Sequence, residues 1–522
     1  LSPSSAASDV YKRQILSTSD THGFVTPTDF KQRDDMHQPF GFSRAAQVVS
    51  NARLQEADDE IVIAIENGDF IQGSPLTNFI AQKAQQFIPV YQEIYDSVGF
   101  DARVLGNHEF NFGVDYLKAT ESDKDVINAN LLKANGVPFM GKPYKIVHRK
   151  GVKIAILGLT TAYIPHWEQQ SNIAGILFND PVAVAKKWVP KLRELADVVI
   201  VSYHGGLERD PLSGELTETD RGENQGYALM RDVPGIDALI TGHQHRRLAG
   251  KVNGVPFTQP GYRGSDVGCI HLDLQNQISD ASLIQTATSV PQQKVMSAVD
   301  TAQQATEQYL DKPLGHLTQS AKFADPFAAR RDNHPYIQLI NRIASERLGV
   351  DIVANAIFND AIHGFDTQVT RREVAINYPY AETLAILKIT GSDFKLALEK
   401  YASYFSVLND KVIISPNYQY PKPQHYNYDI WYGIVYAFDI SQPIGSRLVD
   451  LQYHGHRVAD EDELKVGMTT YRAIGGGDFS MFSPDKIIFE DTEEVADIIA
   501  DYFMQHGTVT LTDAHNFKLF KS

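Results

Sequence analysis

The sequence contains a single cysteine, Cys269, and this scarcity limits the kinds of site that it can build. One cysteine excludes an internal disulfide and a cage of thiolates around a metal ion. Because Cys269 lies between the stretches SDVG and IHLDL, we expect it to be a small buried residue of a strand.

Long apolar stretches and clusters of basic residues are also missing. No apolar stretch approaches the roughly 18–20 residues that a membrane-spanning helix needs, so we expect no membrane span. The 522 residues carry a net charge of −16 without a run of Lys or Arg, which argues against a nucleic-acid polymer as partner. Salt screens this charge within about 8 Å, so a local cationic site can still bind a small anionic substrate.

The first residues, LSPSSAASDVYKRQ, show no strand or helix pattern and no apolar core of signal-peptide length. They resemble translated adapter sequence, so we expect residues 1–14 to be foreign to the protein. The recognisable pattern begins directly after them and leaves little sequence for an export signal. This favours the cytoplasm over secretion or the cell surface, although a processed secreted protein fits the same observation.

The rest of the chain is too long for one hydrophobic core, and its character changes near residue 289. In residues 15–288, short β-branched runs alternate with longer amphipathic stretches, which predicts a layered α/β domain. Residues 289–315 are polar and helix-permissive, and they predict a linker helix. Residues 316–522 have fewer regular alternations and more Tyr and Pro, and they predict a second, smaller domain.

Five predicted strands of the first domain end on Asp, Asn or His. Their sequences are ILSTSD, EIVIAIENGD, DARVLGNHE, DVVIVSYHGG and DALITGHQH. Ligands of α/β proteins gather where the strands end. The side chains delivered there are Asp20, His22, Asp69, Asn107, His108, His204, His243 and His245. A single such residue is more often a turn residue or a helix N-cap, but five strand ends of this kind by accident are improbable.

Seven oxygen and nitrogen donors are too many for one tetrahedral ion and suit two ions that share a ligand. In a turn, His243 and His245 need not share a face, so each can bind a different metal. A carboxylate, with two oxygens and a negative charge, is the natural bridge. Imidazole, carboxylate and carbonyl donors without thiolate indicate Mn, Zn or Fe rather than Ca or Mg alone. We therefore predict two divalent metal ions as cofactors.

The blocks SDTHG, NGD, LGNHEF, SYHGG and TGHQH, in this order, resemble the calcineurin-like metallophosphoesterases. With its C-terminal half, the chain resembles the 5'-nucleotidase / 2',3'-cyclic-nucleotide phosphodiesterase family. The resemblance implies a four-layer β-sandwich flanked by helices, followed by a smaller α/β (α+β) substrate-binding domain. The implied ligands of one metal are Asp20, His22, Asp69 and His245. Those of the other are Asp69, Asn107, His204 and His243.

The same resemblance implies a hydrolytic mechanism. His108 would contact the phosphoryl group and the leaving oxygen, and Asn107 would contact the substrate as well as a metal. Two dications and two carboxylates leave a local charge of about +2, which attracts phosphate in an acidic protein. A hydroxide held by both metals would attack phosphorus in line with the ester oxygen, and the metals and His108 would stabilise the charge that develops.

Two stretches of the second domain, HYNYDIWYGIVYAFDISQP and TTYRAIGGGDF, resemble the family's segments that clamp a nucleobase between two aromatic rings. On that match Tyr471 is one ring and Tyr426 the other, with Tyr428 as the alternative partner. Asp478 would contact the base or the ribose. A Tyr-rich domain buries many tyrosines, so each of these can also be an ordinary core residue.

Asn111, three residues after His108, bears on the substrate. The 5'-nucleotidase branch tends to have Asp there and the cyclic phosphodiesterase branch Asn, and a neutral partner favours the imidazolium less than a carboxylate does. The stretch NAIFNDAIHGFD also lacks the arginine of the Gly-Gly-x-Arg segment typical of 5'-nucleotidases. We therefore predict a monomeric enzyme that hydrolyses nucleoside 2',3'-cyclic phosphates to 3'-nucleotides and then to nucleosides. The alternatives are a 5'-nucleotidase or nucleotide-sugar hydrolase, and a nucleotide-binding surface protein without activity.

Overall fold

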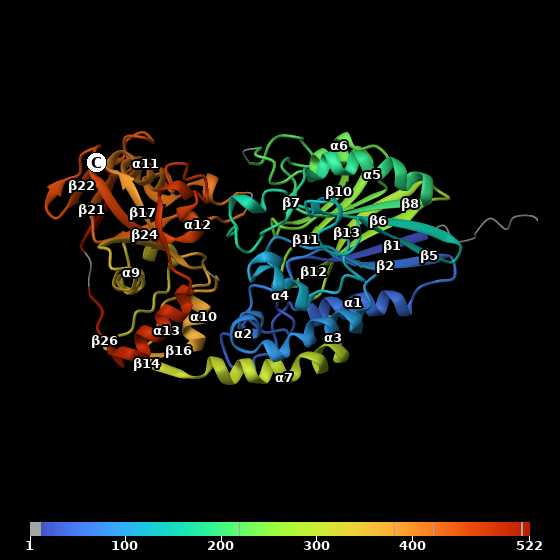
Figure 1. Cartoon of the computed structure of the whole chain (residues 1–522), viewed down its shortest axis with the longest axis horizontal. Coiled ribbons are helices and arrows are strands. Elements are labelled where there is room, and N and C mark those ends of the chain that lie inside the picture. The colour runs from blue at the N-terminus through green and yellow to red at the C-terminus, as the bar shows by residue number, and fades with distance from the viewer. Residues whose placement is uncertain (1–11, 219, 381, 421, 513–514) are drawn as a thin grey trace, which may run out of the picture. The chain divides into compact units, whose positions relative to one another are not determined.

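The computed structural model describes residues 12–522 apart from 219, 381, 421, 513 and 514 (Figure 1). The chain divides into two compact units, Leu1–Thr306 and Glu307–Ser522. The division falls within helix α7, Gln293–Leu310, inside the range 289–315 that predicts a linker helix. No helix among the described residues is long and apolar enough to cross a membrane.

Two sheets form the centre of the first unit. The strand order of one is β13 (Ile278–Gln285), β12 (Asp266–Asp273), β1 (Lys12–Thr18), β2 (Glu60–Glu66) and β3 (Ala102–Arg103). That of the other is β10 (Arg247–Val252), β11 (Val255–Pro260), β9 (Ala238–Ile240), β8 (Val198–His204), β6 (Val152–Thr160) and β5 (Tyr144–Arg149). Two short strands, β4 (Leu131–Leu132) and β7 (Leu177–Phe178), pair outside these sheets.

The strands that precede the predicted ligands are parallel and buried on both faces. In the first sheet β1 pairs in parallel with β2, and β2 with β3. In the second sheet β6, β8 and β9 pair in parallel in the same way. Burial on both faces explains why these strands are nearly continuous apolar runs. Parallel pairing brings their carboxyl ends to one edge of each sheet.

The side chains of β8 show how the two sheets and the helices pack together. Val198 and Ile200 join a core that also contains Ile63 of β2, so the two sheets pack face to face. Val199 and Val201 point to the opposite face and pack with Val189 of helix α5. This alternation is the period of two expected of a strand.

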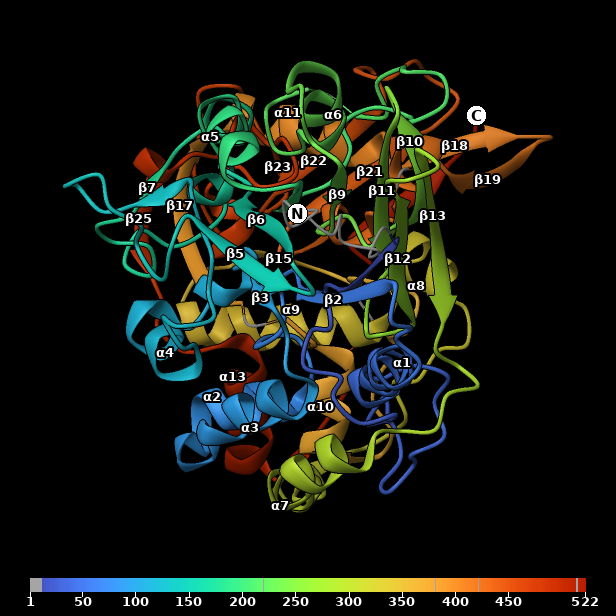
Figure 2. The ribbon, with the colours of Figure 1, turned by 90° about the vertical axis from the view of Figure 1, so that its right-hand side faces the viewer.

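Helices cover the outer faces of the two sheets. The α-helices of the first unit before α7 are α1 (Phe42–Leu54), α2 (Pro75–Lys83), α3 (Pro89–Val98), α4 (Gly113–Thr120), α5 (Pro181–Leu195) and α6 (Gly226–Asp232). Helix α1 contacts β2, β12 and α3, whereas α5 contacts β6, β8 and α6. Figures 1 and 2 show α5 and α6 on one side of the strands and α1 and α3 on the other. The first unit therefore has four layers.

The start of β1 corrects one expectation. Lys12, Arg13 and Gln14 pair with β12 on one side and with β2 on the other. The prediction that residues 1–14 carry no strand is therefore wrong for these three positions, and the first domain includes residues before Ile15. Residues 1–11 lie outside the described part of the chain. Cys269 is buried in β12, as expected.

The second unit is built from mostly antiparallel sheets with helices. Its largest sheet has the order β20 (Asp429–Tyr432), β15 (Ile352–Ala356), β24 (Glu463–Thr469), β17 (Leu384–Thr390) and β25 (Ile487–Glu490). A second sheet consists of β23 (His456–Arg457), β22 (Leu448–Tyr453), β21 (Val435–Asp439) and β27 (Phe517–Phe520). The smaller sheets are β16 (Gln368–Thr370) with β14 (Pro313–Leu317) and β26 (Thr508–Val509), and β18 (Phe405–Leu408) with β19 (Lys411–Ile414). The helices are α8 (Pro326–Arg331), α9 (Pro335–Leu348), α10 (Arg371–Asn377), α11 (Gly391–Ala402), α12 (Thr470–Ala473) and α13 (Val495–His506).

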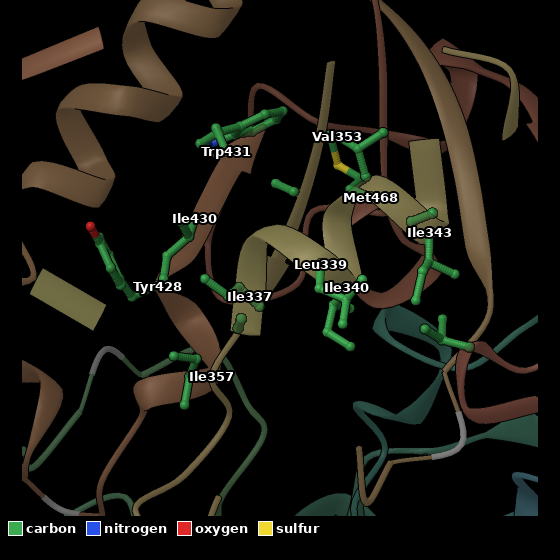
Figure 3. Close-up of a cluster of buried hydrophobic side chains, with 14 of the residues drawn as sticks. Ile337, Leu339, Ile340, Ile343, Val353, Ile357, Tyr428, Ile430, Trp431 and Met468 are labelled. Atoms are coloured by element: carbon green, nitrogen blue, oxygen red, sulfur yellow. The ribbon is translucent and has the colours of Figure 1, made fainter. Parts of the chain in front are cut away.

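Helix α9 is central to the core of this unit. Its sequence favours a helix, with Pro335 at the first position and Gly349 in the left-handed conformation after the last. Ile337 and Ile340 of α9 belong to one buried cluster with Trp431 of β20 (Figure 3). This core is separate from those of the first unit.

Candidate functional site

The carboxyl ends of the parallel strands bring the predicted ligands together. Asp20 follows β1, Asp69 follows β2, and His204 is the last residue of β8. Among the described residues, three groups of His and carboxylate side chains have ligand atoms within 4.8 Å of one another. The groups are Asp20, His22 and His245; His22, Asp69 and His108; and Asp69, His204 and His243.

Five of the predicted ligands have a left-handed backbone. Their φ values are 54° for Asp20, 49° for His22, 59° for Asp69, 67° for His243 and 58° for His245. This conformation is uncommon for residues with a Cβ, and costs on the order of 1–3 kcal/mol each. Strain gathered at one site and held by the surrounding fold is typical of functional sites.

Glycines beside the ligands allow this close packing. A Cβ on Gly106 would lie 2.2 Å from Asp69 Oδ1, and one on Gly242 would lie 2.2 Å from Ser19 Oγ. Any larger residue at these two positions would displace the loops that carry Asp69 and Asp20.

The first group of donors surrounds His22. His22 Nε2 lies 2.9 Å from His245 Nε2 and 3.9 Å from Asp69 Oδ2. His22 Nδ1 lies 3.1 Å from the carbonyl oxygen of Gln72, to which it can donate. This contact leaves the lone pair on Nε2, the atom that faces the other donors. His245 Nε2 is also 3.5 Å from Asp20 Oδ1.

The second group surrounds His204. Its Nδ1 lies 2.6 Å from the carbonyl oxygen of Asn67, which again leaves Nε2 to face the site. His204 Nε2 is 3.2 Å from Asp69 Oδ2 and 3.2 Å from Asn107 Oδ1. Asn107 Oδ1 is also 2.8 Å from His243 Nδ1. Asp69 Oδ2 therefore lies between the two groups, at the place where a bridging ligand is needed.

Burial and charge shift the pKa values of these side chains. Burial raises the pKa of Asp20 to about 7 and lowers the pKa of His22 to about 3. Burial disfavours a charged His204, but the neighbouring Asp69 carboxylate outweighs it and raises the pKa of His204 to about 10. Buried carboxylates, and imidazoles whose second nitrogen faces a backbone carbonyl, fit divalent cations, which would replace the proton of His204 and neutralise the buried negative charge.

Glu109 holds the loops of two neighbouring strands in register, and sequence reasoning did not select it. Its buried carboxylate accepts hydrogen bonds from the backbone nitrogens of Asp69 at 2.8 Å, Phe70 at 2.7 Å and Gly106 at 2.6 Å. The loops that carry the predicted ligands Asp69 and Asn107 thus depend on one buried carboxylate. Its position inside the block LGNHEF is the only signal that the sequence offers for this role.

Glu168 and Glu223 also lie at the site and were not predicted. Asn111 Oδ1 is 2.6 Å from His108 Nδ1, and Asn111 Nδ2 donates to Glu168 Oε2 at 2.6 Å. Glu223 Oε1 is 2.8 Å from His243 Nε2. Glu168 belongs to the loop after β6. The stretch VKIAILGLTT, which contains β6, is a sixth apolar run, and it ends without Asp, Asn or His.

The predicted clamp residues Tyr426 and Tyr471 come together in the second unit. Their ring centroids are 6.4 Å apart and the rings are inclined by 70°. Arg472 donates to the carbonyl oxygen of Tyr426 at 3.0 Å and lies 5.5 Å from the centre of the Tyr471 ring, so it ties the two segments together. One ring has to rotate before a base can stack between the two.

The alternative prediction, that Tyr428 is the partner of Tyr471 in the clamp, is wrong. Tyr428 is 1% exposed and stacks on Tyr404, with ring centroids 4.5 Å apart. Tyr428 is therefore a core residue, and strand β20 begins directly after it. Asp478 is exposed, with a left-handed φ of 68°, and its carbonyl oxygen accepts from Lys400 Nζ.

Two family models match the chain. The model of the calcineurin-like phosphoesterases matches residues 13–247, and that of the 5'-nucleotidase C-terminal domain matches residues 313–484. A 2',3'-cyclic-nucleotide 2'-phosphodiesterase/3'-nucleotidase from Yersinia enterocolitica is 26% identical over 99% of this chain and 90% of its own length. The trifunctional nucleotide phosphoesterase YfkN from Bacillus subtilis is 27% identical over 99% of this chain, which spans only 39% of that protein.

A solved structure extends the similarity to the whole fold. The crystal structure of a putative 5'-nucleotidase from Staphylococcus aureus, in complex with alpha-ketoglutarate, is 32% identical with a TM-score of 0.90. The match covers 98% of this chain and 100% of that chain. The predicted fold class is thereby confirmed for both domains. The chain belongs to the calcineurin-like phosphoesterases that carry a 5'-nucleotidase C-terminal domain.

Proposed function

We propose that this protein is a metal-dependent hydrolase of nucleotide phosphoesters. It acts, as a monomer, on nucleoside 2',3'-cyclic phosphates and then on the resulting 3'-nucleotides. The observation that carries the proposal is the convergence of seven residues with oxygen and nitrogen donors, Asp69 among them, five of which have a left-handed backbone. Strained backbone of this kind gathers at active sites and ligand clamps.

The family implies divalent metal ions, and the donors fit two of them. His22, His245 and Asp20 would hold one ion and His204, His243 and Asn107 the other, with Asp69 shared. The absence of thiolate among these donors supports Mn, Zn or Fe. When bound, two such ions supply a water whose pKa falls towards about 7 and positive charge for the phosphoryl oxygens.

His108 is the residue that we assign to the leaving oxygen. Its ring lies 5.1 Å from the ring of His22, so it borders the ligand groups. Because Nδ1 is directed at Asn111, only Nε2 is left to hold a proton beside the substrate. Delivery of that proton to the departing ribose oxygen is general acid catalysis, which contributes about 10²–10⁴-fold to a rate.

The second domain would bind the nucleoside. Stacking of a base on Tyr426 and Tyr471 contributes about 1–3 kcal/mol and accepts any base. Asp478, next to the clamp segment in sequence, would contact the base or the ribose. These roles come from the resemblance, and the adjacency of the two rings supports them.

The choice of ester rests on three observations, which do not all favour the same substrate. Asn111 in place of Asp and the similarity to the Yersinia enzyme over 99% of the chain favour the cyclic substrate. The similarity to the Staphylococcus protein, a putative 5'-nucleotidase, favours 5'-nucleotides as the second candidate.

Phosphate release with Mn²⁺ from 2',3'-cyclic AMP, 3'-AMP and 5'-AMP in parallel tests the proposal. The cyclic assay also contains a phosphomonoesterase so that ring opening is reported. We expect fast hydrolysis of the cyclic and 3' substrates, slow hydrolysis of 5'-AMP, and none by the Asp69→Asn variant. Faster hydrolysis of 5'-AMP than of the other two would establish the second candidate, and no metal-dependent release from any would refute the proposal.

A further inference from the structure

We infer that Glu168 is a positioning residue that sets the direction of a hydrogen-bond relay from Glu168 through Asn111 to His108. Through this relay it determines which ring nitrogen of His108 carries the hydrogen of the neutral ring. The inference rests on the proposed function for the role of His108 in catalysis. The relay itself rests on contacts of the first unit alone.

Glu168 is 6% exposed, and its carboxylate is surrounded by hydrogen-bond donors. Its Oε2 accepts from Asn111 Nδ2 at 2.6 Å. Its Oε1 accepts from Asn172 Nδ2 at 2.9 Å and from the backbone nitrogen of Gln169 at 2.9 Å. Burial raises the pKa of Glu168, and the hydrogen bonds from Asn172, Gln169 and Asn111 oppose this shift. All three donors are satisfied by an ionised carboxylate, which accepts and does not donate.

This acceptor fixes the orientation of the Asn111 amide. An amide can turn over and exchange its oxygen and nitrogen with little change in shape. Because Glu168 can only accept, the nitrogen of Asn111 faces Glu168 and the oxygen faces His108 Nδ1. An oxygen at 2.6 Å requires a hydrogen on Nδ1. Nε2 is then the nitrogen that carries the lone pair in the neutral ring and takes up a further proton.

The relay also explains how Asn111 can replace the carboxylate of the 5'-nucleotidase branch. An Asp at this position would accept directly from His108 Nδ1. Here the carboxylate belongs to Glu168, on the loop after β6, and it acts on His108 through the neutral amide of Asn111. Asn172 Nδ2 also donates to the carbonyl oxygen of Asn111 at 3.1 Å, which fixes the backbone of the relay.

Glu168→Gln tests the direction of the relay with little change in shape. The backbone nitrogen of Gln169 cannot turn, and Asn172 points to the same oxygen, so the oxygen of the new glutamine stays beside them. Its NH₂ group then faces Asn111, whose amide turns over and directs its own NH₂ at His108 Nδ1. Nδ1 becomes an acceptor, and the hydrogen of the neutral ring moves to Nε2.

Nitrogen NMR of metal-free protein labelled with ¹⁵N-histidine measures the tautomer of the His108 ring without any assay of activity. The signal of His108 is identified by its loss in His108→Gln. We expect the hydrogen on Nδ1 in the wild type, on Nε2 in Glu168→Gln, and again on Nδ1 in the double variant Glu168→Gln/Asn111→Asp. An unchanged tautomer in Glu168→Gln would overturn the inference, whether or not the protein hydrolyses nucleotides.

Kinetics with two leaving groups form the second test. We expect Glu168→Gln to lower kcat about 10- to 100-fold for 3'-AMP, whose ribose oxygen needs a proton, with KM unchanged. The loss should be below about threefold for p-nitrophenyl phosphate, whose leaving group needs no proton, and the double variant should restore the 3'-AMP rate to within about threefold. Equal losses on both substrates without rescue would mean that Glu168 has only a structural role.

Glu208→Gln is the matched control. Glu208 is also buried in the first unit and accepts from the backbone nitrogens of Tyr227 and Ala228 at 3.0 and 2.8 Å, without a contact to the relay among those described. We expect its kcat and the His108 tautomer to match the wild type. If the wild type hydrolyses p-nitrophenyl phosphate but no nucleotide, the proposed substrate fails while the tautomer result still stands.

Discussion

At the scale of single residues, the predicted clamp tyrosines of the second unit differ from the core residue Tyr428 in burial. Tyr428 is enclosed in the core, whereas Tyr426 and Tyr471 are half-buried and adjacent. Sequence spacing cannot make this distinction, because all three lie in stretches that resemble the clamp. The inclination of the two rings could not be predicted either, since it depends on contacts of the folded chain.

Tyr471→Leu should therefore affect binding more than chemistry. Loss of one stacking face removes about 1–3 kcal/mol of binding free energy, which corresponds to a rise in KM of about 5- to 100-fold. We expect kcat to change less than about twofold. Tyr428→Phe is the control and should leave KM and stability unchanged, because the buried Tyr428 hydroxyl has no hydrogen-bond partner among the described residues. Michaelis constants for 3'-AMP check both variants, and an unchanged KM in Tyr471→Leu would exclude the ring from the base site.

At the scale of elements, the ligand-bearing strand ends were predictable and the loops that support them were not. Parallel strands buried on both faces must be apolar throughout, so Asp69 or His204 at the end of such a run stands out in the sequence. Glu168 and Glu223 lie in loops without a periodic pattern. Only the folded chain brings Glu168 beside Asn111, 57 residues away.

Glu109→Gln tests how far the loops after β2 and β3 depend on one carboxylate. Glutamine can accept with one oxygen only, and its NH₂ group would face a backbone N–H. We expect destabilisation of about 1–3 kcal/mol and a 10- to 100-fold loss of Mn²⁺ affinity, as for other residues that orient ligands. Urea unfolding of the metal-free protein and calorimetric titration measure the two effects. Wild-type Mn²⁺ affinity in this variant would show that the loops are held by other contacts.

At the scale of the whole molecule, acid should destabilise the second unit through His425. Burial, together with the nearby Arg330 charge, lowers the pKa of His425 to about 4. Its Nδ1 lies 2.7 Å from the Tyr404 hydroxyl and can accept from it only while the ring is neutral. Below about pH 6.5 the unfolded chain binds a proton that the folded chain does not, so stability falls as the pH drops from about 6.5 to 4 and is retained above that window.

The neutral His425 contributes at most about 3 kcal/mol to the free energy of unfolding above this pH window. His425→Gln should be less stable than the wild type at pH 7.5, with a difference that shrinks towards pH 4.5. Thermal unfolding of both proteins in EDTA at these two pH values measures it. A difference that is the same at both pH values would contradict the low pKa of His425.

The central claim concerns the first unit, where strand ends from two sheets assemble one centre for two metal ions. Mn²⁺ stoichiometry, measured by equilibrium dialysis of the wild type, Asp69→Asn and His108→Ala, tests it most directly. The account predicts two ions per chain in the wild type and in His108→Ala, and one or none in Asp69→Asn, because only Asp69 is shared. One ion in the wild type, or two in Asp69→Asn, would contradict it.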